Sequence, residues 1–298
     1  MIGTLLSFSA MALSVRALAG AFKIFEILTI RTAIGMIILI AIALVKPSLW
    51  REITLTRFRM HILRNGIHFN SQYLWAWSLT LLPLATVFAL EFTMPAWTVP
   101  LAFLFLGEKM TRARIGAVIC GFIGVLVILR PGVSVFNPAT LMVLVAAFGY
   151  ATTNIVTKKL TTTETAFAIV FWMNLIQLPL GYIGSDPLFF QKITAGSIVP
   201  MLGIGIAGLS AHYCLTRALQ VADATVVIPL DFMRLPLIAI VGWTFYGEQL
   251  DVFVFAGAAI IIAGVLWGLN TEARKAGSRT GTPQSDSSNL VKPPSRHG

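Results

Sequence analysis

The sequence has few charged residues and almost no cysteine. Asp, Glu, Lys and Arg make up only 11% of its 298 residues, and the only two cysteines are Cys120 and Cys214. So little charge cannot cover the surface of a soluble domain, and two isolated cysteines form neither a disulfide framework nor a metal-binding pattern. The sequence also has no HExxH motif and no phosphate-binding glycine-rich loop. We therefore expect no enzymatic activity, no metal, no cofactor and no direct use of ATP.

Apolar residues are in large excess. They make up 57% of the chain, and the mean hydropathy is +0.83. Apolar runs of about 18 to 25 residues can cross the hydrocarbon core of a bilayer as helices, which satisfy their own backbone hydrogen bonds. Ten such runs cover residues 2–19, 26–45, 60–82, 84–106, 113–130, 138–157, 165–184, 196–219, 224–246 and 252–270. The sequence thus predicts an all-α integral membrane protein with ten transmembrane helices.

The net charge of +10 is explained by where the basic residues lie. If the N-terminus is cytoplasmic and the helices alternate in direction, fourteen Lys and Arg residues fall in cytoplasmic segments. The outside loops then hold three, which are Lys23, Arg130 and Lys192. This asymmetry follows the positive-inside rule for membrane proteins. We expect both termini in the cytoplasm, contact with a lipid bilayer and no nucleic-acid partner.

An internal repeat becomes visible when the sequence is shifted by about 140 residues. Glu91 then falls on Asp231, and the Gly107–Glu108 pair falls on Gly247–Glu248. Ordered matches of this kind indicate a duplicated structural unit. Each copy holds five spans, an odd number, so the second copy must cross the membrane in the opposite direction.

The repeat defines the expected domains. We predict two inverted five-helix repeats at residues 1–132 and 133–270. Residues 271–298 are polar and rich in Ser, Pro and Gly, so we expect a disordered cytoplasmic tail. Inverted repeats are the architecture of many secondary transporters, whose binding sites lie near the midplane between the halves.

The two repeats also carry a family resemblance. Each ends in a Gly-Glu turn and a glycine-rich last span, "GAVICGFIGVLVILRPG" and "GAAIIIAGVLWGL". Over residues 1–270 this resembles the EamA-type branch of the drug/metabolite transporter superfamily. The segment "HYCLTRALQVADATVVIPLDFMRLP" is similar to a subgroup that includes S-adenosylmethionine and riboflavin carriers. The resemblance implies a secondary transporter in a bacterial-type inner membrane.

Three charged residues lie deep within predicted spans. Asp231 and Arg234 are three residues apart and share a helix face, whereas Glu91 has no basic residue within four positions of it. Charge inside a membrane is costly and commonly functional, although Asp231 and Arg234 could simply neutralise each other. We expect Asp231 and Arg234 to bind substrate. The charge of Glu91 must be met from another helix, by proton uptake or by a ligand. A carboxylate buried without a partner favours its protonated form, so we expect Glu91 to couple transport to protons.

Prolines accompany these acids in both halves. Pro95 follows Glu91, and Pro229 and Pro236 flank Asp231. A proline inside a helix removes a backbone hydrogen bond and bends the helix. Corresponding kinks in two inverted halves are a sequence indicator of a transport site, although each could serve helix packing alone.

Polar and aromatic residues recur at helical spacing on other spans. The stripes that we expect to line a binding cavity contain Asn65, His68 and Gln72; Tyr150 and Asn154; and Tyr213 and Arg217. Trp97 could stack on a planar ligand, although packing explains a single aromatic residue equally well. Arg16, Arg31, Arg64 and Arg217 lie near predicted span ends, where long side chains can reach the headgroups. Gly107 and Gly247 are expected to end helices, and Glu108 and Glu248 to begin the next ones.

The expected function is transport of a small organic metabolite by alternating access. Charges of both signs and several aromatic residues suit a zwitterionic or anionic compound that is amino-acid-like or S-adenosylmethionine-like. A riboflavin-type or drug exporter of the same family is the alternative, and a membrane scaffold or receptor subunit without transport is another. Protons as the coupling ion, the direction of transport and a homodimeric state are left open.

Overall fold

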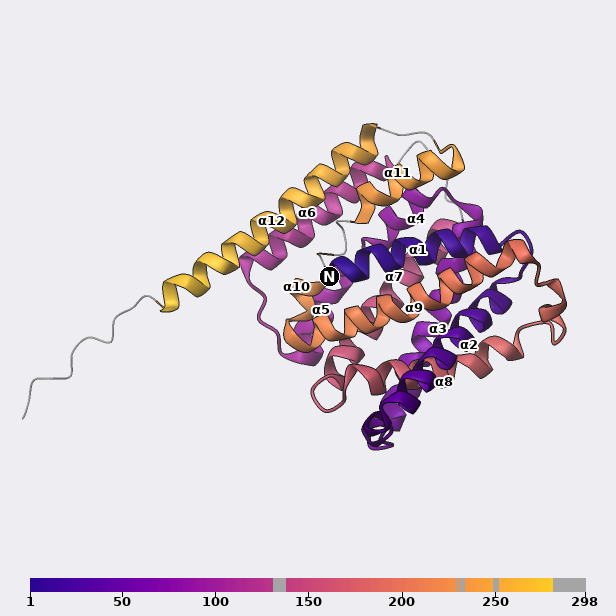
Figure 1. Cartoon of the computed structure of the whole chain (residues 1–298). Coiled ribbons are helices and arrows are strands. Elements are labelled where there is room, and N and C mark those ends of the chain that lie inside the picture. The colour runs from indigo at the N-terminus through magenta and orange to yellow at the C-terminus, as the bar shows by residue number, and fades with distance from the viewer. Residues whose placement is uncertain (131–137, 229, 231–233, 249–251, 281–298) are drawn as a thin grey trace, which may run out of the picture.

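The computed structural model describes residues 1–130, 138–228, 230, 234–248 and 252–280, and these residues form helices and loops without any β-strand (Figure 1). The helices are α1 (Ile2–Leu18), α2 (Ile24–Val45), α3 (Phe58–Leu81), α4 (Leu84–Glu91), α5 (Met94–Leu106), α6 (Arg112–Leu129), α7 (Pro138–Leu160), α8 (Ala166–Ile183), α9 (Ala195–Val221), α10 (Ala224–Val227), α11 (Arg234–Tyr246) and α12 (Val252–Thr280). Two short 3₁₀ helices, η1 (Pro47–Glu52) and η2 (Phe189–Lys192), lie in loops.

The all-α architecture predicted from the sequence is confirmed. Within the described ranges, five helical segments are long and apolar enough to cross a membrane. They are Ile24–Val45, Leu84–Leu106, Pro138–Leu160, Ala166–Ile183 and Ala195–Val221. Shorter apolar helices cover Ile2–Leu18, Leu237–Tyr246 and Phe255–Gly268. The total of ten transmembrane helices stays a prediction.

Two of the predicted spans each hold two helices. The span predicted at 84–106 is interrupted at Phe92 and Thr93, between α4 and α5, and Pro95 is the second residue of α5. Proline fits the first turn of a helix because its missing N–H has no partner there in any case. In the span predicted at 224–246, α10 ends at Val227 and α11 begins at Arg234, with Pro236 in its first turn. Pro229, the other expected kink, lies outside the described residues.

The C-terminal helix is longer than its apolar run. We expected a disordered tail from residue 271, but α12 continues to Thr280. Residues 272–276 are Glu-Ala-Arg-Lys-Ala, residue types that favour the interior of a helix. The helix therefore continues beyond the end of the apolar run. The rest of the expected tail, residues 281–298, lies outside the described residues.

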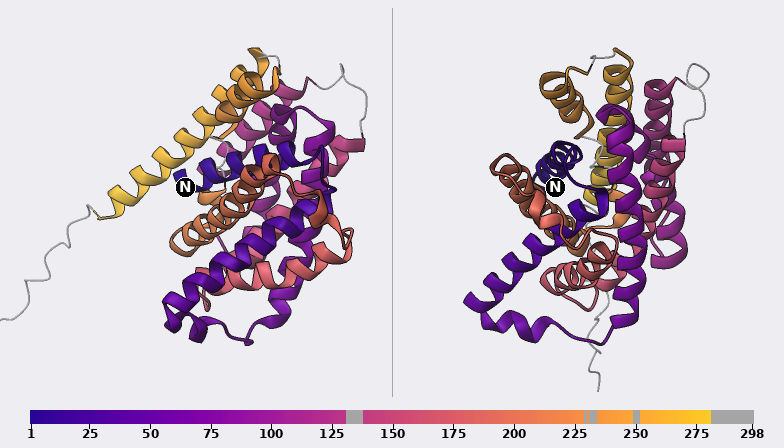
Figure 2. Two further views of the ribbon diagram at one scale, coloured as in Figure 1. Left: turned by 45° about the vertical axis from the view of Figure 1, so that its right-hand side comes forward. Right: turned by 90° about the vertical axis from the view of Figure 1, so that its right-hand side faces the viewer.

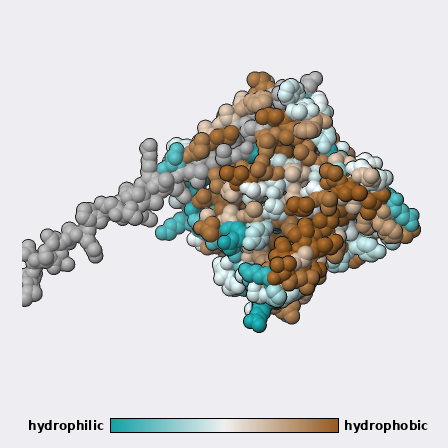
Figure 3. All heavy atoms as spheres, in the orientation of Figure 1, coloured by the Kyte–Doolittle hydropathy of each residue, from teal (hydrophilic) through white to brown (hydrophobic). Residues whose placement is uncertain are grey.

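The long helices pack in reciprocal pairs. α1 packs against α9, α3 against α7, α2 against α8, and α6 against α12 (Figures 1 and 2). The α6–α12 pair is antiparallel, because Gly116 near the start of α6 lies by Trp267 near the end of α12, and Arg130 after α6 lies over the ring of Phe253 at the start of α12. Large apolar side chains cover much of the outer surface, as expected for contact with lipid (Figure 3).

Small residues allow these helices to approach closely, as in other membrane bundles. A Cβ atom on Gly149 of α7 would overlap the side chain of Ser71 on α3. A Cβ on Gly203 of α9 would lie 2.6 Å from the hydroxyl of Ser14 on α1. Glycine is therefore required at contacts between paired helices.

We predict that Gly149→Ala destabilises the bundle. The added methyl group must displace Ser71 or separate α7 from α3, and overpacking of this kind costs about 1–3 kcal/mol. Thermal unfolding of the purified protein in detergent measures the effect. Gly66→Ala on α3 is the matched control, since a Cβ there meets nothing within 4 Å. An unchanged unfolding temperature for Gly149→Ala would contradict the close α3–α7 packing.

Candidate functional site

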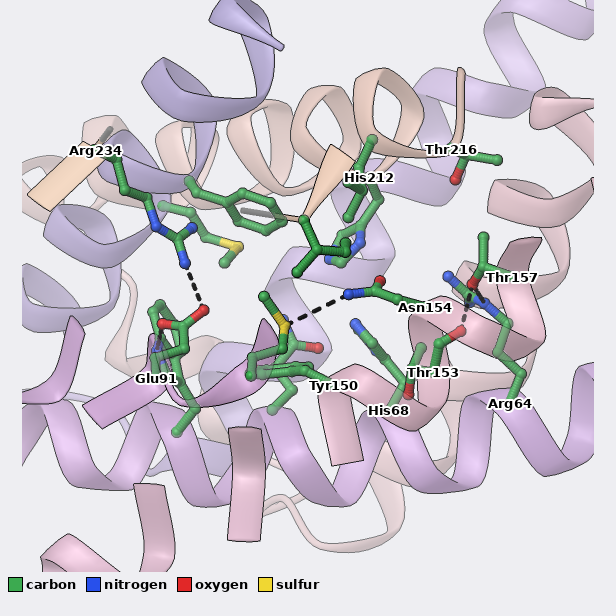
Figure 4. Close-up of a pocket in the computed structure, with 17 residues that line it drawn as sticks. Arg64, His68, Glu91, Tyr150, Thr153, Asn154, Thr157, His212, Thr216 and Arg234 are labelled. Carbon is green, nitrogen blue, oxygen red and sulfur yellow. Dashed lines mark hydrogen bonds and ion pairs between the residues drawn. The ribbon is translucent and has the colours of Figure 1, made fainter. Parts of the chain in front are cut away.

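A cavity lies among the helices (Figure 4). Its walls come from α1, α3, the α4–α5 break, α7, α9 and the region from α10 to α11. The lining residues are Phe8, Met11, Arg64, His68, Gln72, Trp75, Glu91, Met94, Tyr150, Thr153, Asn154, Thr157, His212, Leu215, Thr216, Ile228 and Arg234. Both parts of the chain that we predicted as repeats contribute to this one cavity.

An ion pair closes one end of the cavity. Arg234 Nη2 donates to Glu91 Oε1 at 2.5 Å, and Trp75 Nε1 donates to Glu91 Oε2 at 2.7 Å. The Arg234 guanidinium also lies 5.0 Å from the ring centre of Phe8 and 4.8 Å from that of Phe88. Aromatic faces stabilise a desolvated cation. Charge, hydrogen bonds and aromatic rings together make this buried pair tolerable.

This pair changes the roles that the sequence suggested. Glu91 was the candidate for proton coupling because it lacked a nearby basic residue in the sequence, but Arg234 supplies one from another helix. A partner on another helix was one of the three possibilities that the sequence left open, and Arg234 is that partner. Glu91 and Arg234 therefore belong to one site. Asp231, expected to bind substrate together with Arg234, lies outside the described residues.

One face of α3 forms a wall of the cavity. His68 and Gln72, both predicted, line it together with Trp75. Arg64 also lines it and is only 2% exposed, so the expectation that Arg64 reaches the headgroups was wrong. Arg64 precedes His68 by one helical turn, and that spacing was the available signal for its place on this face.

Asn65 lies behind this wall instead of lining the cavity. Its Oδ1 accepts from Arg64 Nη1 at 2.7 Å and from Gln177 Nε2 at 3.3 Å. Gln177 is also hydrogen-bonded to His68 Nδ1 at 2.8 Å and accepts from Arg31 Nη2 at 2.7 Å. Arg31 is 2% exposed, so it too is buried in the bundle rather than extended to the headgroups. The network supports the cavity wall and contains two buried arginines.

The predicted stripe on α7 lies on the cavity. Tyr150 and Asn154 both line it, and Asn154 Nδ2 lies 3.5 Å from the sulfur of Met94. Thr153 and Thr157 line it as well but were not predicted. Hydroxyl-bearing residues are common in helices for structural reasons, so their positions alone carried little signal.

The predicted stripe on α9 lies on the wrong face. Tyr213 is 43% exposed, and the exposed Arg217 donates to Gln220 at 2.8 Å. The cavity is lined instead by His212, Leu215 and Thr216. Each residue turns a helix by about 100°, so a stripe assigned one position too late faces outward.

Trp97 also lies away from the cavity. It is 44% exposed, and its ring packs edge-on against Phe148 with 5.5 Å between ring centres. Trp97 is consequently removed from the set of candidate binding residues.

The two Gly-Glu turns have a role beyond ending their own helices. Gly107 and Gly247 adopt φ values of 67° and 62°, which glycine accommodates well. Glu108 accepts hydrogen bonds from the backbone N–H groups of Ala224 and Thr225, at 2.9 and 3.2 Å. It therefore caps the first turn of α10 instead of only beginning the next helix, as the sequence suggested.

Glu248, in the second predicted repeat, makes the equivalent contact with a helix of the first. Its Oε1 accepts from the backbone N–H of Leu84, the first residue of α4, at 3.1 Å and is paired with Arg16. Glu108 is paired with Arg114, which also contacts Asp223 at 2.7 Å. The antiparallel α6 and α12 begin next to these two turns, so the two capping sites lie at opposite ends of the bundle.

Comparisons with known proteins agree with this arrangement. The sequence model of the EamA-like transporter family matches residues 1–130 and 137–269. A riboflavin transporter of Brucella anthropi is 32% identical over 238 residues, covering 76% of this chain and 84% of that protein. An S-adenosylmethionine uptake transporter of Rickettsia prowazekii is 28% identical, covering 74% of each chain.

A solved crystal structure has the same fold. It superposes with a TM-score of 0.69 at 18% identity, covering 94% of this chain and 99% of the other. At 18% identity, this similarity shows the fold alone. The family is shown by the sequence model and by the transporter relatives, which cover most of the chain. The chain belongs to the EamA-like transporter family and is an integral membrane transporter, not an enzyme.

Proposed function

We propose that this protein is a secondary transporter that moves a small organic metabolite through the cavity by alternating access. The observation that carries the proposal is the Glu91–Arg234 pair, because it joins the end of α4 in the first predicted repeat to the start of α11 in the second, in the wall of a cavity. Interrupted helices that carry polar groups at the midplane are a common way of building transport sites in secondary transporters.

The packing supports two inverted repeats at residues 1–132 and 133–270. In each proposed repeat the first helix packs against the third helix of the other repeat, as α1 does with α9 and α7 with α3. The second helices, α2 and α8, pair with each other, and so do the last helices, α6 and α12. Exchanging the two halves leaves this pattern of contacts unchanged, as a two-fold axis in the membrane plane requires.

The two capping glutamates are suited to act as gates. Glu108 of the first half holds the start of α10, and Glu248 of the second half holds the start of α4. Each contact joins the two halves at one end of the bundle, so breaking one and keeping the other would open the cavity to one side. By the distribution of Lys and Arg, the Glu108 end faces the cytoplasm, together with both termini.

The substrate class follows from the cavity and the relatives together. The cavity combines charges of both signs with the rings of Trp75, Tyr150, His68 and His212. An amino-acid-like or S-adenosylmethionine-like compound suits it, and riboflavin is the alternative that matches the aromatic residues. Reconstituted proteoliposomes loaded with each compound should exchange it for the labelled compound outside. A scaffold or receptor subunit would show no exchange with any of them.

We predict that Glu91 and Arg234 act as one unit. Glu91→Gln or Arg234→Gln leaves the other charge without this partner, and breaking a buried pair costs roughly 3–5 kcal/mol. Each single variant should therefore lower both transport and the unfolding temperature. The double variant should unfold at a higher temperature than either single variant, because no unmatched charge from this pair is left buried.

The double-mutant cycle includes a surface control. Glu52 accepts from Thr165 in an exposed contact, so Glu52→Gln should leave transport and stability close to wild type. Additive losses in the double variant would mean that Glu91 and Arg234 act independently, against the single site proposed here.

We also predict that the two capping glutamates control opposite sides. With Cys120 and Cys214 changed to Ala, a Leu215→Cys variant places a single thiol in the cavity wall. Glu108→Gln should increase labelling of this thiol by an impermeant reagent added on the cytoplasmic side. Glu248→Gln should increase labelling from the other side. Right-side-out and inside-out vesicles allow the reagent to be added to each side of the membrane separately.

The labelling experiment also has a decisive negative outcome. If both variants raise labelling from the same side, or neither changes it, the capping contacts are not gates. Glu52→Gln in the same background controls for a general loosening of the bundle.

A further inference from the structure

Arg64 is a buried cation without a matching anion. Its Nε donates to Thr157 Oγ1 at 2.8 Å and its Nη1 to Asn65 Oδ1 at 2.7 Å, and both partners are neutral. In the described part of the chain, no carboxylate forms an ion pair with Arg64, and Nη2 makes no hydrogen bond. Arginine stays protonated in proteins, so a full positive charge lies in the cavity wall.

A second arginine adds to this charge. Among the described residues, the side chain of Arg31 hydrogen-bonds only to the neutral Gln177, and the Gln177 amide links it to Asn65 and His68. Burying two cations on neutral amides and hydroxyls is expensive unless an anion joins them. In the described part of the chain, no carboxylate pairs with either arginine, so this end of the cavity has a positive potential.

The opposite end of the cavity does not supply the missing charge. In Figure 4 the Glu91–Arg234 pair lies at one end, and Arg64 with Thr157 lies at the other. Glu91 is already bound by Arg234 and Trp75. The excess positive charge is thus confined to the Arg64 end.

Polar groups between the two ends are available to a ligand. Gln72 Oε1 and His212 Nε2 are buried, line the cavity and make no hydrogen bond to any described residue. The hydroxyls of Thr153 and Thr216 lie on the same cavity (Figure 4). Buried polar atoms without partners are uncommon and mark positions where a ligand can complete the hydrogen bonding.

We propose that Arg64 binds an anionic group, a carboxylate or a phosphate, of the transported molecule. Arg64 Nη2 donates to the anion, Thr157 orients the guanidinium, and Arg31 strengthens the positive potential from behind. The rest of the ligand extends past His68, His212 and Tyr150 towards the Glu91–Arg234 pair. The proposal rests on the proposed function, in which this cavity is the transport site. It makes an acidic group a requirement for tight binding.

Two pairs of compounds test this on the full-length wild-type protein in nanodiscs. S-adenosylmethionine is compared with its decarboxylated form, and flavin mononucleotide with riboflavin. A charge-assisted hydrogen bond to Arg64 should make the acidic member of a pair bind about tenfold tighter or more, measured by thermal shift. If the acidic member is preferred in the first pair but not in the second, the group that Arg64 binds is a carboxylate. If it is preferred in the second pair but not in the first, the group is a phosphate. Equal binding within both pairs would overturn the proposal.

Variants then assign the preference to Arg64. Arg64→Gln should abolish the preference for the acidic compound, and Arg64→Lys should keep part of it because the charge remains. Thr157→Val should weaken it, whereas Thr152→Val, on the same helix with its hydroxyl bonded to its own backbone at 3.0 Å, should not. If Arg64→Gln does not fold, the wild-type comparison and Thr157→Val still decide the question.

Uptake into proteoliposomes separates this proposal from the proposed function. An acidic compound that binds through Arg64 but does not cross the membrane would support the anion site and overturn transport through it. Riboflavin uptake that Arg64→Gln leaves unchanged, without binding of either acid, would overturn the anion site and leave transport standing. Neither binding nor uptake of any of the four compounds would overturn both.

Discussion

The structure depends on how charge is neutralised where water is scarce. An ionised side chain inside a membrane costs several kcal/mol unless an opposite charge and hydrogen bonds meet it. Glu91 and Arg234 are 143 positions apart in the sequence, yet they meet at 2.5 Å. This contact joins the two halves of the chain at the depth of the cavity.

The capping glutamates connect this pair to the ends of the bundle. α4 is eight residues long, about 12 Å, and runs from Leu84, which Glu248 caps, to Glu91 itself. α10 starts at Ala224, which Glu108 caps, and leads towards Arg234. The Glu248 cap and Glu91 thus lie at the two ends of one short helix.

Sequence reasoning located the helices well but not the contacts between them. Apolar run length determines where a helix can cross lipid, and the observed helices begin and end close to the predicted limits. Glu91 and Arg234 were recognised as site residues, but their pairing depends on tertiary packing that no local pattern encodes. His212 was missed in favour of Tyr213, because an error of one position turns a helical face by about 100°. Arg64 was misjudged because its distance from a helix end does not say which way it points.

From the Arg64 end of the cavity, α7 leads to the helix junction that Glu108 caps. Thr157, which holds Arg64, is followed on α7 by Lys158, whose ammonium donates to the carbonyl oxygens of Leu219 and Ala222 at 2.7 Å. Those carbonyls end α9, and α10 with its Glu108 cap begins two residues later. An anion at Arg64 would therefore lie close to this helix junction and alter the potential around Lys158 and Glu108. In the proposed mechanism, occupancy of the anion site and the state of the Glu108 contact are then coupled through charge, without requiring a change at the Glu248 contact.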